Sequence, residues 1–375
     1  MTVETVLIAA FSGRALAQSA RRAGYAPLVC DAFGDLDTRD AALAVRVIDG
    51  AMATGFRTKP LISALEDLAK AAPAPPIGLV LGSGFEDKLR LIEALAKRFR
   101  LLGTSAATYK ACKNPATFFA TLDALEIPHP QTQIEAPRDT TGWLSKRIGG
   151  SGGRHIRECS DHPRTMPRRY FQKRLDGDRL SVGGVFPAET GDLTVTRQWI
   201  SPSSAQPFRF GGAVTIPVHN LRRAALCDAA VRVADAMKLT GMASFDFIVS
   251  NGIPHLLEVN PRPGASLDVL DDARGSQFQA HIAACFGNPP PVATRSRPQA
   301  ARAMAILHAD RRSVALGDMH WPDWSADRGP PGTEIPLGAP LASVLAEAEN
   351  ADAAEALARS RLAELEDLIY EHALP

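Results

Sequence analysis

The sequence has few cysteines and no long apolar run, and both absences narrow the class of protein. Its five cysteines are scattered, and no Cys/His cluster has zinc-ligand spacing. No apolar stretch approaches the ~20 residues that cross a bilayer. The apolar start, residues 6–11, is short and follows Glu4 rather than a basic segment, so we expect a buried strand and not a signal peptide. We therefore predict a cytoplasmic protein with reduced thiols and no membrane partner.

The sequence also lacks an excess of charge of either sign. It has 42 Lys and Arg against 41 Asp and Glu, a formal net charge of +1 over 375 residues. That balance gives no electrostatic basis for nucleic-acid binding. The length exceeds one ordinary core, so more than one domain is expected.

The first hundred residues alternate strand-like and helix-like segments. Such alternation predicts a parallel sheet with helices on both faces. The expected strands are 5–11, 27–30, 45–49 and 77–81, and the expected helices are 14–23, 61–71 and 85–99.

From residue 143 the pattern changes to short strands between glycine loops, which indicates α+β structure. We expect strands at 143–147, 170–174, 180–186, 194–200, 244–249, 254–259 and 303–308, and helices at 114–124 and 221–237. A proline-rich stretch, 288–292, is typical of a linker. Alanine-rich helices are expected from Leu341 to the end.

Three oxygen-bearing side chains cluster near the segment FDFIVSNGIPHLLEVN. Asp246 lies in one expected strand, and Glu258 and Asn260 lie in the next. Residues two apart on a strand face the same way, so Glu258 and Asn260 project together. Mg²⁺ prefers such ligands together with phosphate oxygens. The alternative is a solvated surface hairpin, which fits poorly because apolar residues surround the acids.

The turn between these strands sets a geometric condition. Asn251-Gly252 predicts a two-residue reversal. A regular hairpin would then pair Asp246 with Leu257 and place Asp246 and Glu258 on opposite faces. We therefore predict a bulge or an odd loop that brings the two carboxylates to one face.

A glycine loop follows a lysine in WLSKRIGGSGGRHI. Backbone N–H groups in such a loop can approach phosphate oxygens closely. The loop is not a P-loop, since GxxxxGK[ST] is absent. A flexible turn is the alternative, but Lys146 just before the loop favours a nucleotide. Lys113 precedes a predicted helix and is either a phosphate ligand or a solvated lysine.

Four segments together resemble the ATP-grasp superfamily, in the family's order: CKNPATFFATLDALEIPHP, WLSKRIGGSGG, YFQKRLDGDRLSV and LLEVNPRPGAS. The resemblance implies an ATP-grasp fold of mixed α/β and α+β class, spanning the whole chain. Its parts would be a pre-ATP-grasp parallel-sheet domain (1–107), an ATP-grasp domain of two lobes (108–290, central lobe about 108–180) and a small C-terminal domain (291–375).

The resemblance also implies a site that binds ATP with Mg²⁺, with Mn²⁺ as the alternative metal. Arg262 and Lys146 would stabilise the transferring phosphoryl group, and Asp246, Glu258 and Asn260 would hold the metal. The nucleotide would contact Lys113, Lys146, Gly149, Gly150, Ser151, Gly152, Gly153, Gln172, Lys173, Arg174, Leu175 and Asp178. Two departures stand out: Arg179 occupies a common ribose-binding acid position, and Ser244 a common arginine position.

The sequence is most similar to a subgroup of predicted ATP-dependent carboligases related to biotin carboxylase and to carboxylate–amine ligases. That likeness implies ligation of small-molecule carboxylate and amine substrates through an acyl-phosphate. Members with such features accompany methanopterin and methylofuran cofactors, which suggests the addition of an amino acid. The alternatives are a carboxylase that uses carboxyphosphate and a nucleotide-binding protein with a degenerate site. A homodimer is common among relatives.

Overall fold

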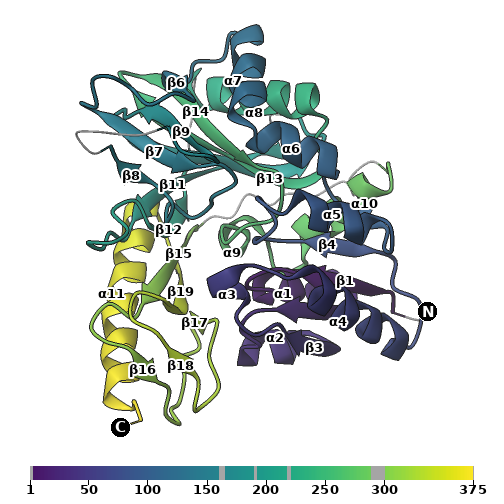
Figure 1. Ribbon diagram of the computed structural model, residues 1–375. Coiled ribbons are helices and arrows are strands. Elements are labelled where there is room, and N and C mark those ends of the chain that lie inside the picture. Colours follow the sequence, from purple (N-terminus) through teal and green to yellow (C-terminus); the bar gives the residue numbers. More distant parts are fainter. Residues whose placement is uncertain (1–2, 160–164, 190–191, 218–220, 289–299, 375) are drawn as a thin grey trace.

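The computed structural model describes residues 3–159, 165–189, 192–217, 221–288 and 300–374, so most of the predicted linker lies outside the described residues. Its strands form five-stranded, four-stranded and eight-stranded sheets and a two-stranded ribbon (Figure 1). The five-stranded sheet lies at one end of the molecule. The long helix α11 (Ala351–Glu371) flanks the opposite side.

The N-terminal sheet is parallel, as the alternating pattern predicted, with strand order β3-β2-β1-β4-β5. Its central strand is β1, so the connections reverse direction between β1 and β4. Ligands of open parallel sheets bind at such a switch point. The strands are β1 (Thr5–Ala9), β2 (Ala26–Asp31), β3 (Ala44–Val47), β4 (Leu79–Leu81) and β5 (Leu101–Leu102).

Helices cover both faces of this sheet. One face packs on α3 (Ala51–Thr54), α4 (Thr58–Ala71) and α5 (Leu89–Ala96). The other packs on α1 (Arg14–Arg22), α2 (Leu36–Ala41) and α10 (Ser276–Cys285). Because α10 comes from much later in the chain, the core around this sheet is completed by a helix that lies outside the first hundred residues.

The four-stranded antiparallel sheet carries the glycine loop. Its order is β6-β9-β7-β8, with β6 (Thr132–Gln133), β7 (Trp143–Arg147), β8 (Arg157–Glu158) and β9 (Arg169–Lys173). Two helices precede it, α6 (Ala106–Lys113) and α7 (Pro115–Ala124). The sequence analysis missed α6, whose start is capped by Ser105, which accepts a hydrogen bond from the Thr108 N–H at 3.2 Å.

The eight-stranded antiparallel sheet crosses the predicted boundary at residue 290. Its order is β14-β13-β10-β11-β12-β15-β19-β17. One half packs on α8 (Leu221–Met237) and the other on α11. The strands are β10 (Asp178–Phe186), β11 (Thr194–Ile200), β12 (Phe210–Thr215), β13 (Gly241–Ser250), β14 (Ile253–Asn260), β15 (Ala301–His308), β17 (Ser325–Ala326) and β19 (Pro340–Ala348). The short helix α9 (Leu267–Leu270) follows β14, and β16 (Val314–Ala315) with β18 (Glu334–Ile335) forms the ribbon.

The expectation of helices from Leu341 was wrong at its start. Residues 340–348 form β19, which pairs antiparallel with β15, and α11 begins only at Ala351. Ala342, Val344 and Ala346 all enter the core beneath α11. Burial beside β15 therefore outweighs the helical composition of the segment.

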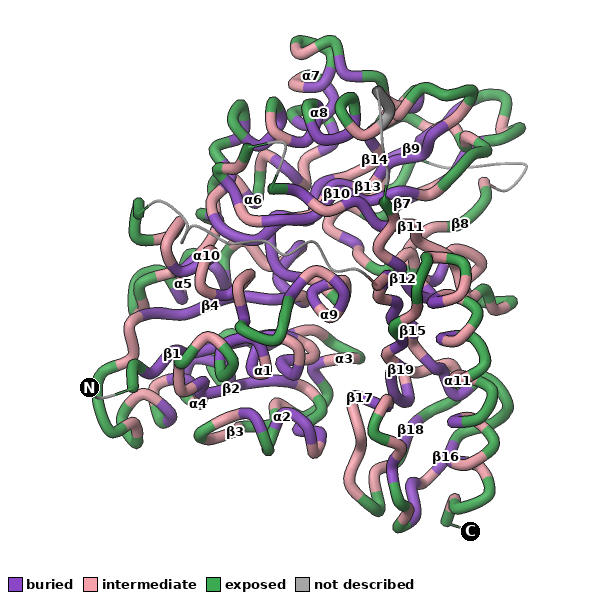
Figure 2. The backbone as a smooth tube through the Cα atoms, turned by 180° about the vertical axis from the view of Figure 1, so that it is seen from behind, coloured by how far each residue is buried: buried purple, intermediate pink, exposed green. Residues whose placement is uncertain are grey.

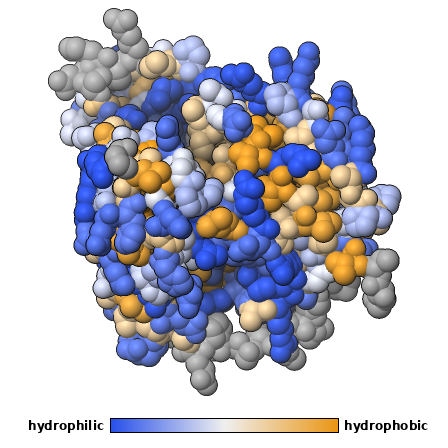
Figure 3. Space-filling model, turned by 90° about the horizontal axis from the view of Figure 1, so that it is seen from below, coloured by the Kyte–Doolittle hydropathy of each residue, from blue (hydrophilic) through white to orange (hydrophobic). Residues whose placement is uncertain are grey.

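Burial follows the sheets. Seen from behind, the buried stretches run along β1, β4, β10 and β13 (Figure 2). From below, polar residues cover most of the surface, and apolar residues gather toward one side (Figure 3). Among the described residues, no helix has the length and apolar character to cross a membrane.

Candidate active site

The hairpin β13–β14 carries the predicted acids, and its pairing is irregular as predicted. Asp246 lies opposite Glu258, but the next residue, Phe247, lies opposite Leu256. Leu257 is thus the extra residue of a bulge, which puts both carboxylates on one face. The turn is the predicted two-residue reversal, because Ser250 pairs directly with Ile253.

Asn260 joins the two acids and a lysine into one network. Its Nδ2 donates to Oδ2 of Asp246 at 2.9 Å. Nζ of Lys113 donates to Oδ1 of Asn260 at 3.1 Å and lies 3.6 Å from Oε2 of Glu258. Lys113 comes from the end of α6, which the structure brings beside β14. Its contact with both oxygens shows that Glu258 and Asn260 converge on one cationic position.

Asp246 accepts hydrogen bonds from two neighbouring strands. Gln198 on β11 donates to its Oδ1 at 3.2 Å, and Ser181 on β10 is a further hydrogen-bond donor. Burial raises the pKa of Asp246 to about 6, and the nearby charge of Glu258 adds to this. The protein alone therefore disfavours the charge that a metal ligand needs at this position.

Lys146 reaches the same cluster from β7. It is 5% exposed, and its Nζ donates to Oε1 of Gln172 at 2.6 Å. Burial lowers the pKa of Lys146, while Glu258 and Asp246 act in the opposite direction. Gln172, predicted to contact adenine, is itself buried on β9 and also donates to Thr132.

The donor set fits a divalent cation bound together with phosphate. Burial raises the pKa of Glu258, but the charges of Lys113 and Lys146 outweigh that effect and hold it below its usual value. Within the described part of the chain, no group of three or more His, Cys, Asp or Glu side chains is placed to hold a metal. The set here consists of two carboxylates and one amide, so phosphate oxygens and water would complete the coordination of Mg²⁺.

The glycine loop contacts the N-terminal sheet. A Cβ at Gly149 would lie 2.7 Å from the backbone oxygen of Glu86, so only glycine fits there, at φ +71°. At the other end of the loop, a Cβ at Gly153 would overlap the carbonyl of Phe208. The loop is thus seated between the segment after β4 and the segment before β12.

Arg262, two residues after Asn260, is held by an acid that the sequence analysis did not identify. Its Nε and Nη2 lie 2.8 and 2.7 Å from Oε1 of Glu86. The second oxygen of Glu86 accepts from the Gly84 N–H at 2.8 Å. Both side chains are buried, and burial alone would raise the pKa of Glu86, but Arg262 and Lys113 lower it.

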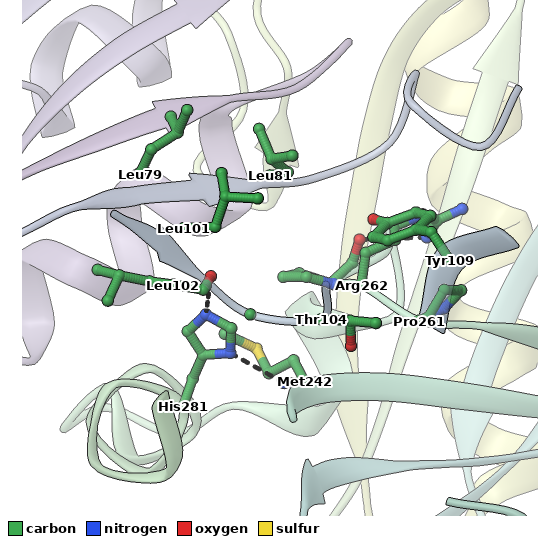
Figure 4. Close-up of a pocket in the computed structure, with 12 residues that line it drawn as sticks. Leu79, Leu81, Leu101, Leu102, Thr104, Tyr109, Met242, Pro261, Arg262 and His281 are labelled. Atoms are coloured by element: carbon green, nitrogen blue, oxygen red, sulfur yellow. Dashed lines mark hydrogen bonds between the residues drawn. The ribbon is translucent and has the colours of Figure 1, made fainter. Parts of the chain in front are cut away.

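A mostly apolar pocket lies behind Arg262 and not over the acids (Figure 4). His281 closes one side: its Nδ1 accepts from the Met242 N–H at 2.9 Å, and its Nε2 lies 3.1 Å from the Leu102 oxygen. Burial lowers the pKa of His281 to about 4, so the ring is neutral at pH 7. It therefore ties β5 of the N-terminal sheet to β13.

The remaining predicted nucleotide contacts lie along the connection from β9 to β10. Lys173 donates to the Thr141 oxygen, and Arg174 pairs with Glu158. Leu175 and Asp178 follow on the same connection. The role of these residues toward adenine and ribose stays a prediction.

Three groups that contact the site were not found from the sequence: Glu86, Gln198 and Ser181. Glu86 had a readable signal, since it follows Gly82-Ser83-Gly84 at the carboxyl end of a predicted parallel strand, where ligands bind. Gln198 and Ser181 have ordinary strand surroundings. They reach Asp246 only through the strand order β13-β10-β11, which the sequence does not reveal.

A family model described as the ATP-grasp domain matches residues 112–266, which include Lys113, Lys146 and the β13–β14 hairpin. Residues 112–266 therefore match an ATP-grasp domain, and the predicted ATP-grasp fold is confirmed. Proteins with this domain include ATP-dependent ligases and synthetases. The expectation of an enzyme of that class, using ATP with Mg²⁺, is confirmed at the level of the family.

One curated relative is the carbamoyl phosphate synthase large chain of Thermoanaerobacter pseudethanolicus, 24% identical over 226 residues. The match covers 53% of this chain but only 21% of that relative, so the chain spans about a fifth of its length.

Two solved structures show the same fold over nearly the whole chain. One is the biotin carboxylase domain of the Hydrogenobacter thermophilus 2-oxoglutarate carboxylase, a dimer solved with MgADP, ADP and bicarbonate. Its TM-score is 0.71 at 12% identity, and the match covers 96% of this chain and 89% of that one. An L-amino acid ligase from Bacillus licheniformis has a TM-score of 0.68 at 15% identity, covering 100% and 99%.

Proposed function

We propose that the chain is an ATP- and Mg²⁺-dependent carboxylate–amine ligase that works through an acyl-phosphate. The observation that carries this proposal is the bulge at Leu257, which places Asp246 and Glu258 on one face beside Lys113. Two acids, two lysines and one arginine supply what phosphoryl transfer from ATP requires, namely a metal position and cations around the triphosphate.

In this proposal the residues have separate roles. Asp246, Glu258 and Asn260 hold the cation, which neutralises phosphate charge. Lys113 and Lys146 bind the phosphates, the glycine loop Gly149 to Gly153 covers them, and residues 172–175 with Asp178 contact adenine and ribose. Arg262, fixed by Glu86, faces the transferring phosphoryl group.

The reaction transfers the terminal phosphoryl group from ATP to a carboxylate oxygen and releases ADP. The amine then attacks the acyl carbon, phosphate leaves, and the amine loses a proton. Closure of the glycine loop over the site would exclude water from the acyl-phosphate. The strands that flank the loop are already anchored to the segment after β4, since Arg147 at the end of β7 and Arg168 just before β9 pair with Asp87 at 3.4 and 3.1 Å.

The proposed substrates are a small carboxylate and a small amine, on the analogy of amino-acid addition in methanopterin-type or methylofuran-type cofactor synthesis. We place the enzyme in the cytoplasm, which agrees with five unpaired cysteines. We keep the predicted division into three domains as part of the proposal. A homodimer also belongs to it, on the analogy of the dimeric carboxylase domain.

Trapping with hydroxylamine tests this function. The chain is incubated with ATP, MgCl₂ and pools of carboxylates, and ADP and hydroxamates are measured. We expect ADP release that depends on one carboxylate, together with its hydroxamate. ADP release that needs only bicarbonate would identify a carboxylase. ATP binding without ADP release in any pool would identify a nucleotide-binding protein with a degenerate site.

A further inference from the structure

His155 lies two residues after the glycine loop (Gly149 to Gly153), and nothing above gives it a role. Among the described residues, its Nδ1 is buried and has no hydrogen-bond partner. Buried ring nitrogens are usually paired, so an unpaired one beside a candidate site indicates a place for a ligand atom.

The ring is fixed by its own loop. A Cβ at Gly150 would overlap the imidazole, coming within 2.5 Å of Cδ2 and Nδ1, so glycine at 150 is what seats the ring. The ring also interacts with the backbone of Ser151, within the same loop. The backbone oxygen of His155 accepts from Nη2 of Arg169 at 3.2 Å, which anchors the loop to β9.

The charged groups that act on the ring are those of the candidate phosphate site: Glu258, Lys146 and Lys113. Burial is the main cause that lowers the pKa of His155, to about 4, and the two lysines add to it. The ring therefore lies within electrostatic range of the acid and lysine cluster.

We propose that His155, through Nδ1, binds an oxygen of the terminal phosphoryl group of ATP. The ring rests on Gly150, and the adjacent Gly149 abuts Glu86, which holds Arg262. That end of the loop is the one where the group is transferred, whereas Lys146 bonds Gln172 near the adenine strand. The negative triphosphate favours the imidazolium, whose Nδ1–H donates to the phosphoryl oxygen.

This inference rests on the proposed function, because it requires ATP at this site. It adds a phosphate ligand that distinguishes ATP from ADP. A residue that binds only the terminal phosphoryl group contributes to affinity for the triphosphate and not for the diphosphate.

Calorimetry with two nucleotides tests the role without an acceptor substrate. The full chain is titrated with the β,γ-imido analogue of ATP and with ADP, each with MgCl₂. We expect His155→Ala to weaken binding of the imido analogue about 10–100-fold and binding of ADP less than about twofold. His155→Asn should recover most of the loss, because its amide N–H can take the place of Nδ1–H. His255→Ala, at the turn end of β14, is the matched control.

Gly150→Ala supplies an independent measurement. The added methyl group displaces the ring of His155, so it should weaken binding of the imido analogue in the wild-type background. In the His155→Ala background it should have little effect, because the ring is gone. This non-additivity separates displacement of the ring from general damage to the loop.

Two outcomes would overturn the assignment. Equal losses for both nucleotides in His155→Ala would show a structural role for the loop, and no loss for either would show no role. If the wild-type chain bound neither nucleotide, the proposed function would fail, and this inference would fail with it. Either of the two outcomes above, obtained with a wild-type chain that binds nucleotide, would overturn this inference alone.

Discussion

Two buried charged clusters in this molecule have opposite character. The site cluster comprises Lys113, Lys146, Asp246 and Glu258. The junction cluster comprises Arg14, Asp35, Asp268 and Asp327, where the loop after β17, the helix α9 and the start of α1 meet. Both combine carboxylates and cations away from water, so composition alone does not tell them apart.

In the junction cluster, the central arginine is fully paired. Nη1 and Nη2 of Arg14 lie 2.5 and 2.6 Å from the two oxygens of Asp268. Its Nε and Nη2 also bond Asp327, at 3.0 and 3.2 Å. Burial would lower the pKa of Arg14, but these two carboxylates outweigh it and raise it well above its usual value. The charges at Arg14 are thus stabilised in place.

In the site cluster the charges are incompletely compensated. Burial raises the pKa of Asp246 and lowers that of Lys146, so each is pushed toward its neutral form. Such displaced pKa values are common at functional sites, where a ligand completes the electrostatics. The contrast shows that pairing, and not burial alone, separates a cluster that holds the fold from one prepared for a ligand.

The largest expected effect comes from Glu258→Gln. We expect ADP formation to fall about a thousandfold or more, because the metal and Lys113 lose their charged partner. The melting temperature should change by only a few degrees, since the cluster does not hold the fold. The matched control is Glu355→Gln on α11, where the acid pairs with Arg197 and Arg359. Full turnover in Glu258→Gln would refute the metal assignment and remove the contrast between the clusters.

The sequence was informative about local features of this site. The bulge at Leu257 followed from counting residues between Asp246, the Asn251-Gly252 turn and Glu258, because strand side chains alternate with a fixed period. The glycine loop and Lys146 could also be identified from the sequence, because they lie within one short segment.

Contacts between distant segments could not be predicted. Glu86 and Arg262 are 176 residues apart, and Gln198 on β11 reaches Asp246 on β13 across the intervening strand β10. The strand β19 was missed because its alanine-rich sequence favours a helix, and only its pairing with β15 makes it a strand. In each case the deciding interaction lies in tertiary structure.

The second prediction concerns Arg14→Met. Removing the guanidinium leaves Asp268 and Asp327 buried without their cation, which costs about 3–5 kcal/mol of unfolding free energy. Urea or thermal denaturation measures this loss. The binding of ADP with MgCl₂ per folded molecule should be unchanged, because Arg14 lies outside the site cluster.

The control for this variant is Arg311→Met. Arg311 pairs with Glu366 and Asp367 on the surface of α11, and such exposed pairs contribute little to stability. A loss in Arg14→Met no larger than in this control would show that the junction cluster does not stabilise the fold.

The smallest effect is a pH dependence from Asp35. Burial raises the pKa of Asp35 to about 7, and the nearby Asp327 adds to this. A raised pKa means that the folded chain holds this proton more tightly than the unfolded chain, whose Asp titrates near ~4. The contribution of protonated Asp35 to the free energy of unfolding is therefore full below pH ~4 and is lost as the pH rises through about 7. We expect Asp35→Asn to remove a decline of about 1–3 kcal/mol between pH 5 and 8.

Thermal denaturation at those two pH values measures the decline. Asn at position 35 can still accept from the Thr38 N–H, as Asp35 does at 2.8 Å, so the cap of α2 is retained. Asp40→Asn, an exposed change on the same helix, should leave the decline in place. A wild-type slope in Asp35→Asn would contradict the assignment. In the Arg14→Met background the slope of stability against pH should also change, because Asp327 then loses the cation that balances its effect on Asp35. That coupling would tie the pH dependence to the junction cluster.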